Sequence, residues 1–278
     1  MARCEVCFRH CELKEGQTGA CGGRICRGGR VTALNYGKAT SLALDPIEKK
    51  PLARFHPRSM ILSVGSFGCN LRCPFCQNFE ISWSEEAQRF RSECSEITPA
   101  ELAALAEYHR PRGNIGVAFT YNEPLIGYEF VRDTAKLVHE AGMLNAVVTN
   151  GTAELGVLEE ISPYIDAFNI DLKAFSADTY KNILGGDLQT VLDFIVTAHK
   201  TAHIELTTLI VPGMNDSERE IGELTSWVAS VDPEIPLHIS RFFPRFKMTD
   251  RQATSVRLVY RLADIAREKL RYVYTGNC

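Results

Sequence analysis

Three cysteines stand close together in the stretch "FGCNLRCPFCQNF", namely Cys69, Cys73 and Cys76. No fourth cysteine follows within the next dozen residues. Thiolates are the ligands that iron–sulfur clusters require, and a four-iron cluster held by three cysteines keeps one iron open for another ligand. An amino acid that chelates through its amine and carboxylate could take that position. The alternatives are a zinc site with a distant fourth ligand and three buried free cysteines.

A second group of cysteines lies near the N-terminus: Cys4, Cys7, Cys11, Cys21 and Cys26. The surrounding segment is rich in glycine and has almost no apolar core, so a metal or the main body of the protein must order it. Four of these thiols suffice for a zinc site or for a second iron–sulfur cluster, and the spacing leaves both open. A cluster could pass electrons onward, whereas a zinc knuckle could hold a partner protein. Cys94 and Cys278 stay unassigned.

The composition is that of an ordinary globular protein, with 45% hydrophobic and 23% charged residues among 278. A net charge of −3 argues against a dedicated nucleic-acid binder. No run of about 18 apolar residues predicts a membrane span, and the N-terminus lacks the apolar core of a signal peptide. We therefore expect a cytoplasmic protein, in a compartment where clustered cysteines indicate metal ligation before disulfides.

Regular secondary structure is expected from about residue 60, where short apolar runs alternate with amphipathic stretches. The expected strands are 60–66, 114–121, 143–150, 165–173, 202–212, 235–243 and a weaker 272–275. The expected helices lie near 98–109, 127–141, 153–162, 187–199, 217–230 and 250–269. This alternation predicts a parallel sheet with right-handed crossovers. Six units are too few for an eightfold barrel, so we predict an α/β fold, a partial (β/α)6 TIM-like barrel over 59–278, preceded by a cysteine-rich extension over 1–58.

Polar residues follow the carboxyl ends of these strands, which meet at one rim in parallel α/β folds. They are Gln77, Asn78, Glu123, Thr149, Asn150, Gly151, Asp171, Lys173, His238 and Arg241. Each has a plain structural alternative. Glu123 could be a charge at a helix start, the segment 149–151 a simple turn, and His238 a core histidine. Asp171 and Lys173 face the same side of an extended strand, where they could form only a surface ion pair.

The cysteine loop resembles the C-x3-C-x2-C signature of the radical S-adenosylmethionine (SAM) superfamily. Phe75 matches the aromatic residue that this superfamily usually has beside the last cysteine. The segments "DPIEKKPL", "FTYNEP", "VVTNG", "NIDLKAF", "VPGMND" and "HISRFFP" are similar to the branch of pyruvate formate-lyase-activating enzymes, and most of all to the AmmeMemoRadiSam-system radical SAM enzymes. The similarity covers about residues 31–275, in order. One departure is "YNE", which replaces both glycines of the family's Gly-Gly-Glu motif.

The resemblance implies a [4Fe–4S] cluster on Cys69, Cys73 and Cys76, with SAM on the open iron. One electron, from a donor such as flavodoxin or ferredoxin, then cleaves SAM to methionine and a 5′-deoxyadenosyl radical, which takes a hydrogen atom from a substrate. The SAM contacts that it implies are Phe75, Asn78, Glu123, Thr149, Asn150, Gly151, Asp171, Lys173 and His238.

Two kinds of enzyme fit this resemblance. One activates a glycyl-radical enzyme, and the other modifies a different protein, an RNA or a small molecule. Simple glycyl-radical activases lack the early cysteine run, which favours the second kind. A hypothesis from a different class is an electron carrier or zinc-binding scaffold without SAM chemistry.

Overall fold

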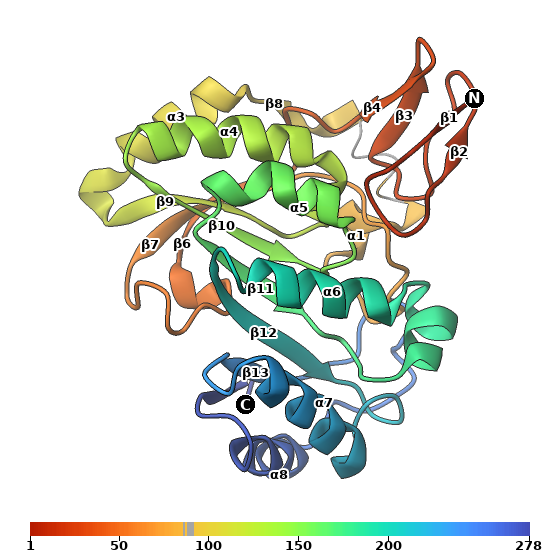
Figure 1. The fold of residues 1–278 in the computed structure, drawn as a ribbon, viewed down its shortest axis with the longest axis vertical. Helices are drawn as coiled ribbons and strands as arrows, with labels where there is room; N and C mark the ends of the chain where they lie inside the picture. Colours follow the sequence, from red (N-terminus) through yellow and green to blue (C-terminus); the bar gives the residue numbers. More distant parts are fainter. Residues whose placement is uncertain (86, 88–91) are drawn as a thin grey trace.

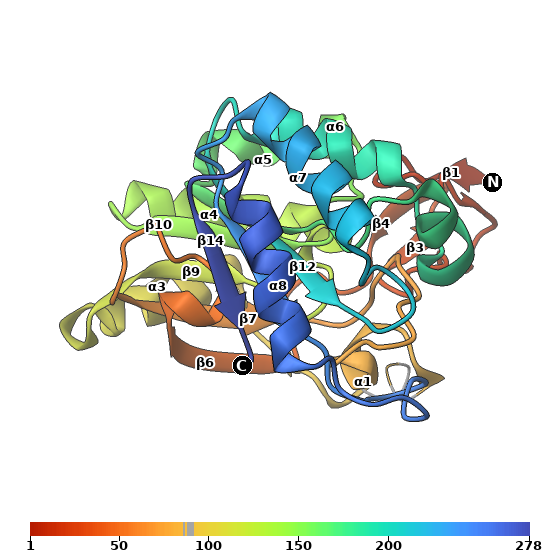
Figure 2. The same cartoon turned by 90° about the horizontal axis from the view of Figure 1, so that it is seen from below.

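A single eight-stranded sheet forms the centre of the computed structural model, which describes residues 1–85, 87 and 92–278 (Figure 1). In spatial order its strands are β14 (Val273–Gly276), β13 (Leu237–Arg241), β12 (His203–Ile210), β11 (Ala167–Asp171), β10 (Leu144–Thr149), β9 (Asn114–Phe119), β7 (Met60–Gly65) and β6 (Ser41–Pro46). Neighbours from β7 to β14 pair in parallel, whereas β6 pairs antiparallel with β7. The sheet curves into an open barrel (Figure 2).

Six helices connect the parallel strands and cover the outer side of the sheet (Figures 1 and 2). They are α3 (Pro99–Tyr108), α4 (Tyr128–Glu140), α5 (Leu155–Ile161), α6 (Leu188–Ala198), α7 (Glu218–Val231) and α8 (Val256–Arg267). The expected start of α3 is present, because Thr98 and Glu101 form a capping box. The predicted partial (β/α)6 barrel is thereby confirmed. None of the helices in the described part of the chain combines the length and apolar character that crossing a membrane requires.

The amino-terminal end of the barrel is closed by the segment between β6 and β7. Ile47, Leu52 and Phe55 from this segment pack against Ala118, Ala146 and Ala167 inside the barrel. Small alanine side chains on three adjacent strands leave the room that these larger side chains fill. The barrel is therefore solid at this end, and an open site can form only at the opposite rim.

A buried carboxylate holds this closing segment in place. Glu205 on β12 accepts hydrogen bonds from the amides of Ala53 (2.9 Å) and Arg54 (2.7 Å). The ring nitrogens Nε2 of His203 and His238 lie 3.0 Å and 2.6 Å from the same carboxylate. The sequence analysis did not single out Glu205, and its partners show that it anchors the base of the barrel.

The cysteine-rich segment folds into short strands that rest on the rim of the barrel (Figure 1). These strands are β1 (Ala2–Arg3), β2 (Glu12–Leu13), β3 (Arg24–Arg27) and β4 (Arg30–Ala33). Cys7 forms an isolated antiparallel β-bridge with Ala153, and the Glu154 amide donates to the Val6 carbonyl over 3.0 Å. The boundary at residue 58 stays a prediction; strand β6, which precedes it, is an edge strand of the main sheet.

Candidate active site

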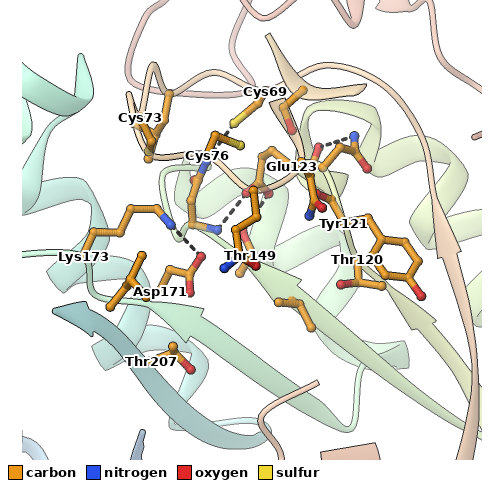
Figure 3. Close-up of a pocket in the computed structure, with 18 of the residues that line it drawn as sticks. Cys69, Cys73, Cys76, Thr120, Tyr121, Glu123, Thr149, Asp171, Lys173 and Thr207 are labelled. Atoms are coloured by element: carbon orange, nitrogen blue, oxygen red, sulfur yellow. Dashed lines mark hydrogen bonds and ion pairs between the residues drawn. The ribbon is translucent and has the colours of Figure 1, made fainter. Parts of the chain in front are cut away.

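A pocket of about 280 Å³ lies at the carboxyl ends of the parallel strands. Its walls come from the cysteine loop and from the ends of β9, β10, β11 and β12 (Figure 3). Most of the side chains expected at this rim line it: Cys69, Cys73, Phe75, Cys76, Gln77, Asn78, Glu123, Thr149, Asn150, Asp171 and Lys173. The structure therefore brings together residues that the sequence placed on four separate loops.

The three cysteines lie at one end of this pocket (Figure 3). Gly68, with φ +96°, turns the chain out of β7, and the Cys76 amide closes a turn onto the Cys73 carbonyl over 3.2 Å. The amide nitrogen of the Asn150 side chain lies 3.6 Å from the Cys69 sulfur. Burial raises the pKa of all three thiols, that of Cys73 to about 12. Metal ligation therefore has to displace protons from these sulfurs.

The donor set at this end of the pocket fits an iron–sulfur cluster. In the described ranges, no three His, Cys, Asp or Glu side chains converge tightly enough to hold a single metal ion. Three thiols on one loop suit an inorganic cluster in which each sulfur binds a different iron.

Glu123 is a buried carboxylate in the pocket wall, only 3% exposed. It accepts hydrogen bonds from the Asn150 amide (2.7 Å), the Thr149 hydroxyl (2.7 Å) and the Leu125 amide (3.1 Å). Burial raises its pKa to about 7, although these bonds act in the opposite direction. Glu123 thus starts a short helix, as one alternative expected, and also presents a carboxylate that a cation in the pocket would stabilise.

Tyr121 keeps a glycine-like backbone where the family motif has a glycine. Its φ is +74°, in the left-handed region that non-glycine residues rarely adopt. Its carbonyl accepts from the Asn78 side chain over 2.7 Å, and its hydroxyl donates to Asp45 over 2.8 Å. Lys50 also contacts Asp45, at 2.9 Å, from the closing segment. The substitution therefore preserves the local backbone shape and adds an anchor inside the barrel.

Asp171 and Lys173 form an ion pair of 2.7 Å that faces the pocket (Figure 3). Burial lowers the pKa of Lys173, but the charges of Asp171 and Cys73 outweigh it and hold that pKa above its usual value. The Lys173 amide also donates to the Tyr180 hydroxyl over 3.0 Å. This pair is part of the pocket wall and not a surface ion pair.

Three expected residues, Gly151, His238 and Arg241, lie outside the pocket lining, and the Arg241 side chain donates to the Thr254 carbonyl over 2.7 Å. His238 stacks on Tyr274, with ring centroids 5.2 Å apart, and contacts Glu205. Gly151 has φ +69°, and an added Cβ would lie 2.9 Å from Ile170, so it serves the turn after β10. His238 therefore lies where the alternative of a core histidine expects it, and Gly151 lies where the alternative of a simple turn expects it.

The sequence analysis missed several residues that complete the pocket. Thr207 on β12, Ser240 on β13 and Tyr121 after β9 also line it. Thr207 follows Glu205 by two positions on the strand, so both point into the barrel. The alternation of side chains along a strand could have predicted that Thr207 faces the barrel interior. The sequence analysis considered mainly charged residues and so passed over small hydroxyl residues.

Comparison with known proteins agrees with this geometry. Residues 63–225 match the family model of the radical SAM superfamily. An uncharacterized protein of Methanocaldococcus jannaschii is 40% identical over 280 residues, which cover 99% of this chain and 81% of the relative. The pyruvate formate-lyase-activating enzyme of Clostridium pasteurianum is 30% identical over 168 residues, which cover 59% of this chain and 67% of the enzyme.

A solved structure shows the same fold. A domain of the pyruvate-formate lyase-activating enzyme from Bacteroides vulgatus matches with a TM-score of 0.50 and 21% identity. The match covers 58% of this chain and 98% of that domain. Since the family model spans more than half of the chain and includes all three loop cysteines, the protein belongs to the radical SAM superfamily, with relatives in the pyruvate formate-lyase-activating branch.

Proposed function

We propose that this protein cleaves SAM reductively and uses the resulting 5′-deoxyadenosyl radical to take a hydrogen atom from a substrate. The observation that carries the proposal is the shared pocket: three loop cysteines and the buried carboxylate of Glu123 line one cavity at the carboxyl ends of the strands. Membership of the superfamily implies a [4Fe–4S] cluster and SAM as the cofactors. When bound, they supply the electron transfer and the radical, and the protein binds, orients and excludes water.

Each pocket residue has a proposed part in holding these groups. Cys69, Cys73 and Cys76 are the cluster ligands. Glu123 accepts a hydrogen bond from the SAM ammonium group, because a buried carboxylate of raised pKa gains a cationic partner there. The other contacts are proposed from their place in the lining, and they are Phe75, Asn78, Thr149, Asn150, Asp171 and Lys173.

Asp171 and Lys173 carry opposite charges and suit different parts of SAM. The Lys173 ammonium suits the SAM carboxylate, because its positive charge also lies near the Cys73 sulfur. The Asp171 carboxylate suits the ribose hydroxyls or the positive sulfonium. Gly151 and His238 act from behind the pocket, through the turn after β10 and through Glu205.

The substrate of the radical is a protein, an RNA or a small molecule that reaches this pocket. A second candidate is activation of a glycyl-radical enzyme, in which the hydrogen comes from a protein backbone. Two relatives named as pyruvate formate-lyase-activating enzymes, one 30% and one 26% identical, favour it. The electron donor is a carrier such as flavodoxin or ferredoxin. The likeness to AmmeMemoRadiSam-system enzymes stays a prediction.

The proposal is tested by anaerobic reconstitution with iron and sulfide, reduction with dithionite, and measurement of 5′-deoxyadenosine formed from SAM. We expect product from the wild type and none from Cys73→Ala. Cys94→Ala, which lies outside both cysteine groups, is the matched control and should keep the activity. Activity that survives Cys73→Ala refutes the site. A wild type that binds iron but forms no 5′-deoxyadenosine supports the scaffold hypothesis instead.

A further inference from the structure

The N-terminal cysteine segment sits directly against the catalytic cysteine loop. The amide of Cys69 donates to the carbonyl of Cys21 over 3.1 Å. An added Cβ on Gly68 would lie 2.8 Å from that same carbonyl oxygen and 3.2 Å from the Gly23 nitrogen. The Cδ1 atom of Ile126 would lie 2.8 Å from the same Cβ, so the two backbones and this side chain pack closely around Gly68. Such close contact ties the position of Cys21 to that of Cys69.

Four of the five N-terminal thiols form one group. The Cys4 amide donates to the Cys11 carbonyl over 2.9 Å, which closes the loop that carries Cys7. Burial raises the pKa of Cys21 to about 11, and the charges of Cys7, Cys4 and Cys11 add to this rise, which places all four thiols near one another. Three of them are buried, and Cys11 is partly exposed.

Cys26 does not belong to this group. It lies in β3 opposite Val31 in the hairpin, and its sulfur is 4.0 Å from a carboxylate oxygen of Glu15. The charges of Cys4, Cys7 and Cys11, and not that of Cys26, are among the main ones that act on Cys21. The segment thus supplies four grouped thiols and one separate thiol, which spacing alone did not distinguish.

Two arginine side chains, those of Arg72 and Arg24, lie near members of this group. Arg72 donates to the carbonyls of Cys69 (2.9 Å) and Ala20, so its guanidinium spans both cysteine segments. The charges of Cys21 and Cys69 both act on it. Arg24, buried and paired with Glu129, is also near Cys4 and Cys21.

We propose that Cys4, Cys7, Cys11 and Cys21 hold a second iron–sulfur cluster, closed by four cysteines and joined to the catalytic loop through the Cys21–Cys69 hydrogen bond. Four cysteines are the complete ligand set of a [4Fe–4S] cluster. A cluster at this place would lie beside the loop of Cys69 and could pass electrons to it, a role that zinc, which has no redox chemistry, does not take.

The test counts iron and acid-labile sulfide per full-length chain after anaerobic reconstitution. We expect about eight irons in the wild type and about four in a variant with Cys69, Cys73 and Cys76 all replaced by Ala, because one four-iron cluster then remains. A Cys7→Ala/Cys21→Ala variant should also keep about four. If the double replacement prevents folding, Cys11→Ser repeats the test, because Cys11 is partly exposed and its replacement disturbs the core less. Cys26→Ala is the matched control and should keep about eight.

A spectroscopic readout separates the two clusters. Four cysteines leave no iron open, so adding SAM should leave the electron paramagnetic resonance signal of the reduced catalytic-loop variant unchanged. The same addition should alter the signal of the N-terminal variants. The proposal is overturned if the catalytic-loop variant binds no iron, if it binds one zinc ion, or if Cys26→Ala loses iron as Cys11→Ser does. Failure of the proposed function gives a different result. The wild type would then hold about four irons, all in the N-terminal cluster.

Discussion

The backbone amide of Cys69 donates a 3.1 Å hydrogen bond to the carbonyl oxygen of Cys21, so the two cysteine-rich parts of the chain are in direct contact. Gly68, at φ +96°, makes this approach possible because it has no Cβ. The extension therefore packs against the loop of Cys69, Cys73 and Cys76, and its docking is testable apart from any metal.

Gly68→Ala should separate these two segments. The new Cβ would meet the Cys21 carbonyl oxygen at 2.8 Å, in addition to the strain of a positive φ. We expect a loss of about 2 kcal/mol or more in the free energy of unfolding, measured by urea denaturation. Gly213→Ala is the matched control, because φ there is +73° and nothing lies within 4 Å of the added Cβ. Equal losses in both variants would mean that strain alone, and not docking, sets the effect.

Glu123→Gln should weaken SAM binding while the cluster stays in place. Glutamine keeps the size and accepts through one oxygen, but it loses the charge that an ammonium group needs. A hydrogen bond to a charged group contributes about 1.5–3 kcal/mol, so we expect about 10- to 100-fold weaker binding in equilibrium dialysis.

The matched control is Glu220→Gln. Glu220 is also a partly buried carboxylate that accepts from a backbone amide, that of Phe175, at 2.8 Å, and it is not among the pocket residues. Unchanged SAM affinity in Glu123→Gln, with unchanged iron content, would remove Glu123 from the proposed binding site.

The order of strands and helices followed from sequence because parallel α/β folds repeat one pattern of apolar runs and amphipathic helices. Rim residues such as Glu123 and Asp171 followed too, since strand ends converge. The buried pairing of His238 with Glu205 did not, because it depends on which residues of neighbouring strands lie side by side. Nor could the glycine-like backbone of Tyr121 be predicted, since a tyrosine gives no local signal for positive φ.

Glu205 should make stability depend on pH in the acid range. Burial raises its pKa, but bonds from His203, His238 and two backbone amides outweigh this and lower it from 4.5 to about 2. A carboxyl group with a depressed pKa in the folded state stabilises above its unfolded pKa, and this contribution is lost as pH falls from about 4.5 to about 2. The shift corresponds to a contribution on the order of 3 kcal/mol at neutral pH.

Glu205→Gln tests this by comparing urea midpoints of the two metal-free proteins from pH 7 to pH 3. The variant should be less stable at pH 7, and its midpoint should change less between pH 4.5 and pH 3. Parallel curves would show that Glu205 does not titrate with folding. Glu101→Gln is a matched control in exposed surroundings, where the carboxylate accepts from the amide and the hydroxyl of Thr98.

If both proposed clusters are present, we expect the electron to reach the loop of Cys69, Cys73 and Cys76 through the N-terminal cluster. A low-potential carrier such as reduced flavodoxin or ferredoxin would give one electron to the N-terminal cluster, which would pass the same electron on through Cys21 and Cys69. No proton moves and no bond breaks in this transfer. Cys11 is the partly exposed member of the four N-terminal ligands, so Cys11→Ser alters the entry point without touching the pocket.

In the Cys11→Ser variant, we expect the protein carrier to reduce the catalytic cluster at least tenfold more slowly than in the wild type. Freeze-quench electron paramagnetic resonance follows this reduction. SAM affinity should be unchanged, because the pocket residues are intact. Dithionite, a small reductant that can reach the pocket directly, should reduce the variant and the wild type at similar rates. Equal rates with the protein carrier would place electron entry at the pocket itself, and the cluster at Cys4, Cys7, Cys11 and Cys21 would then serve to hold the extension on the rim.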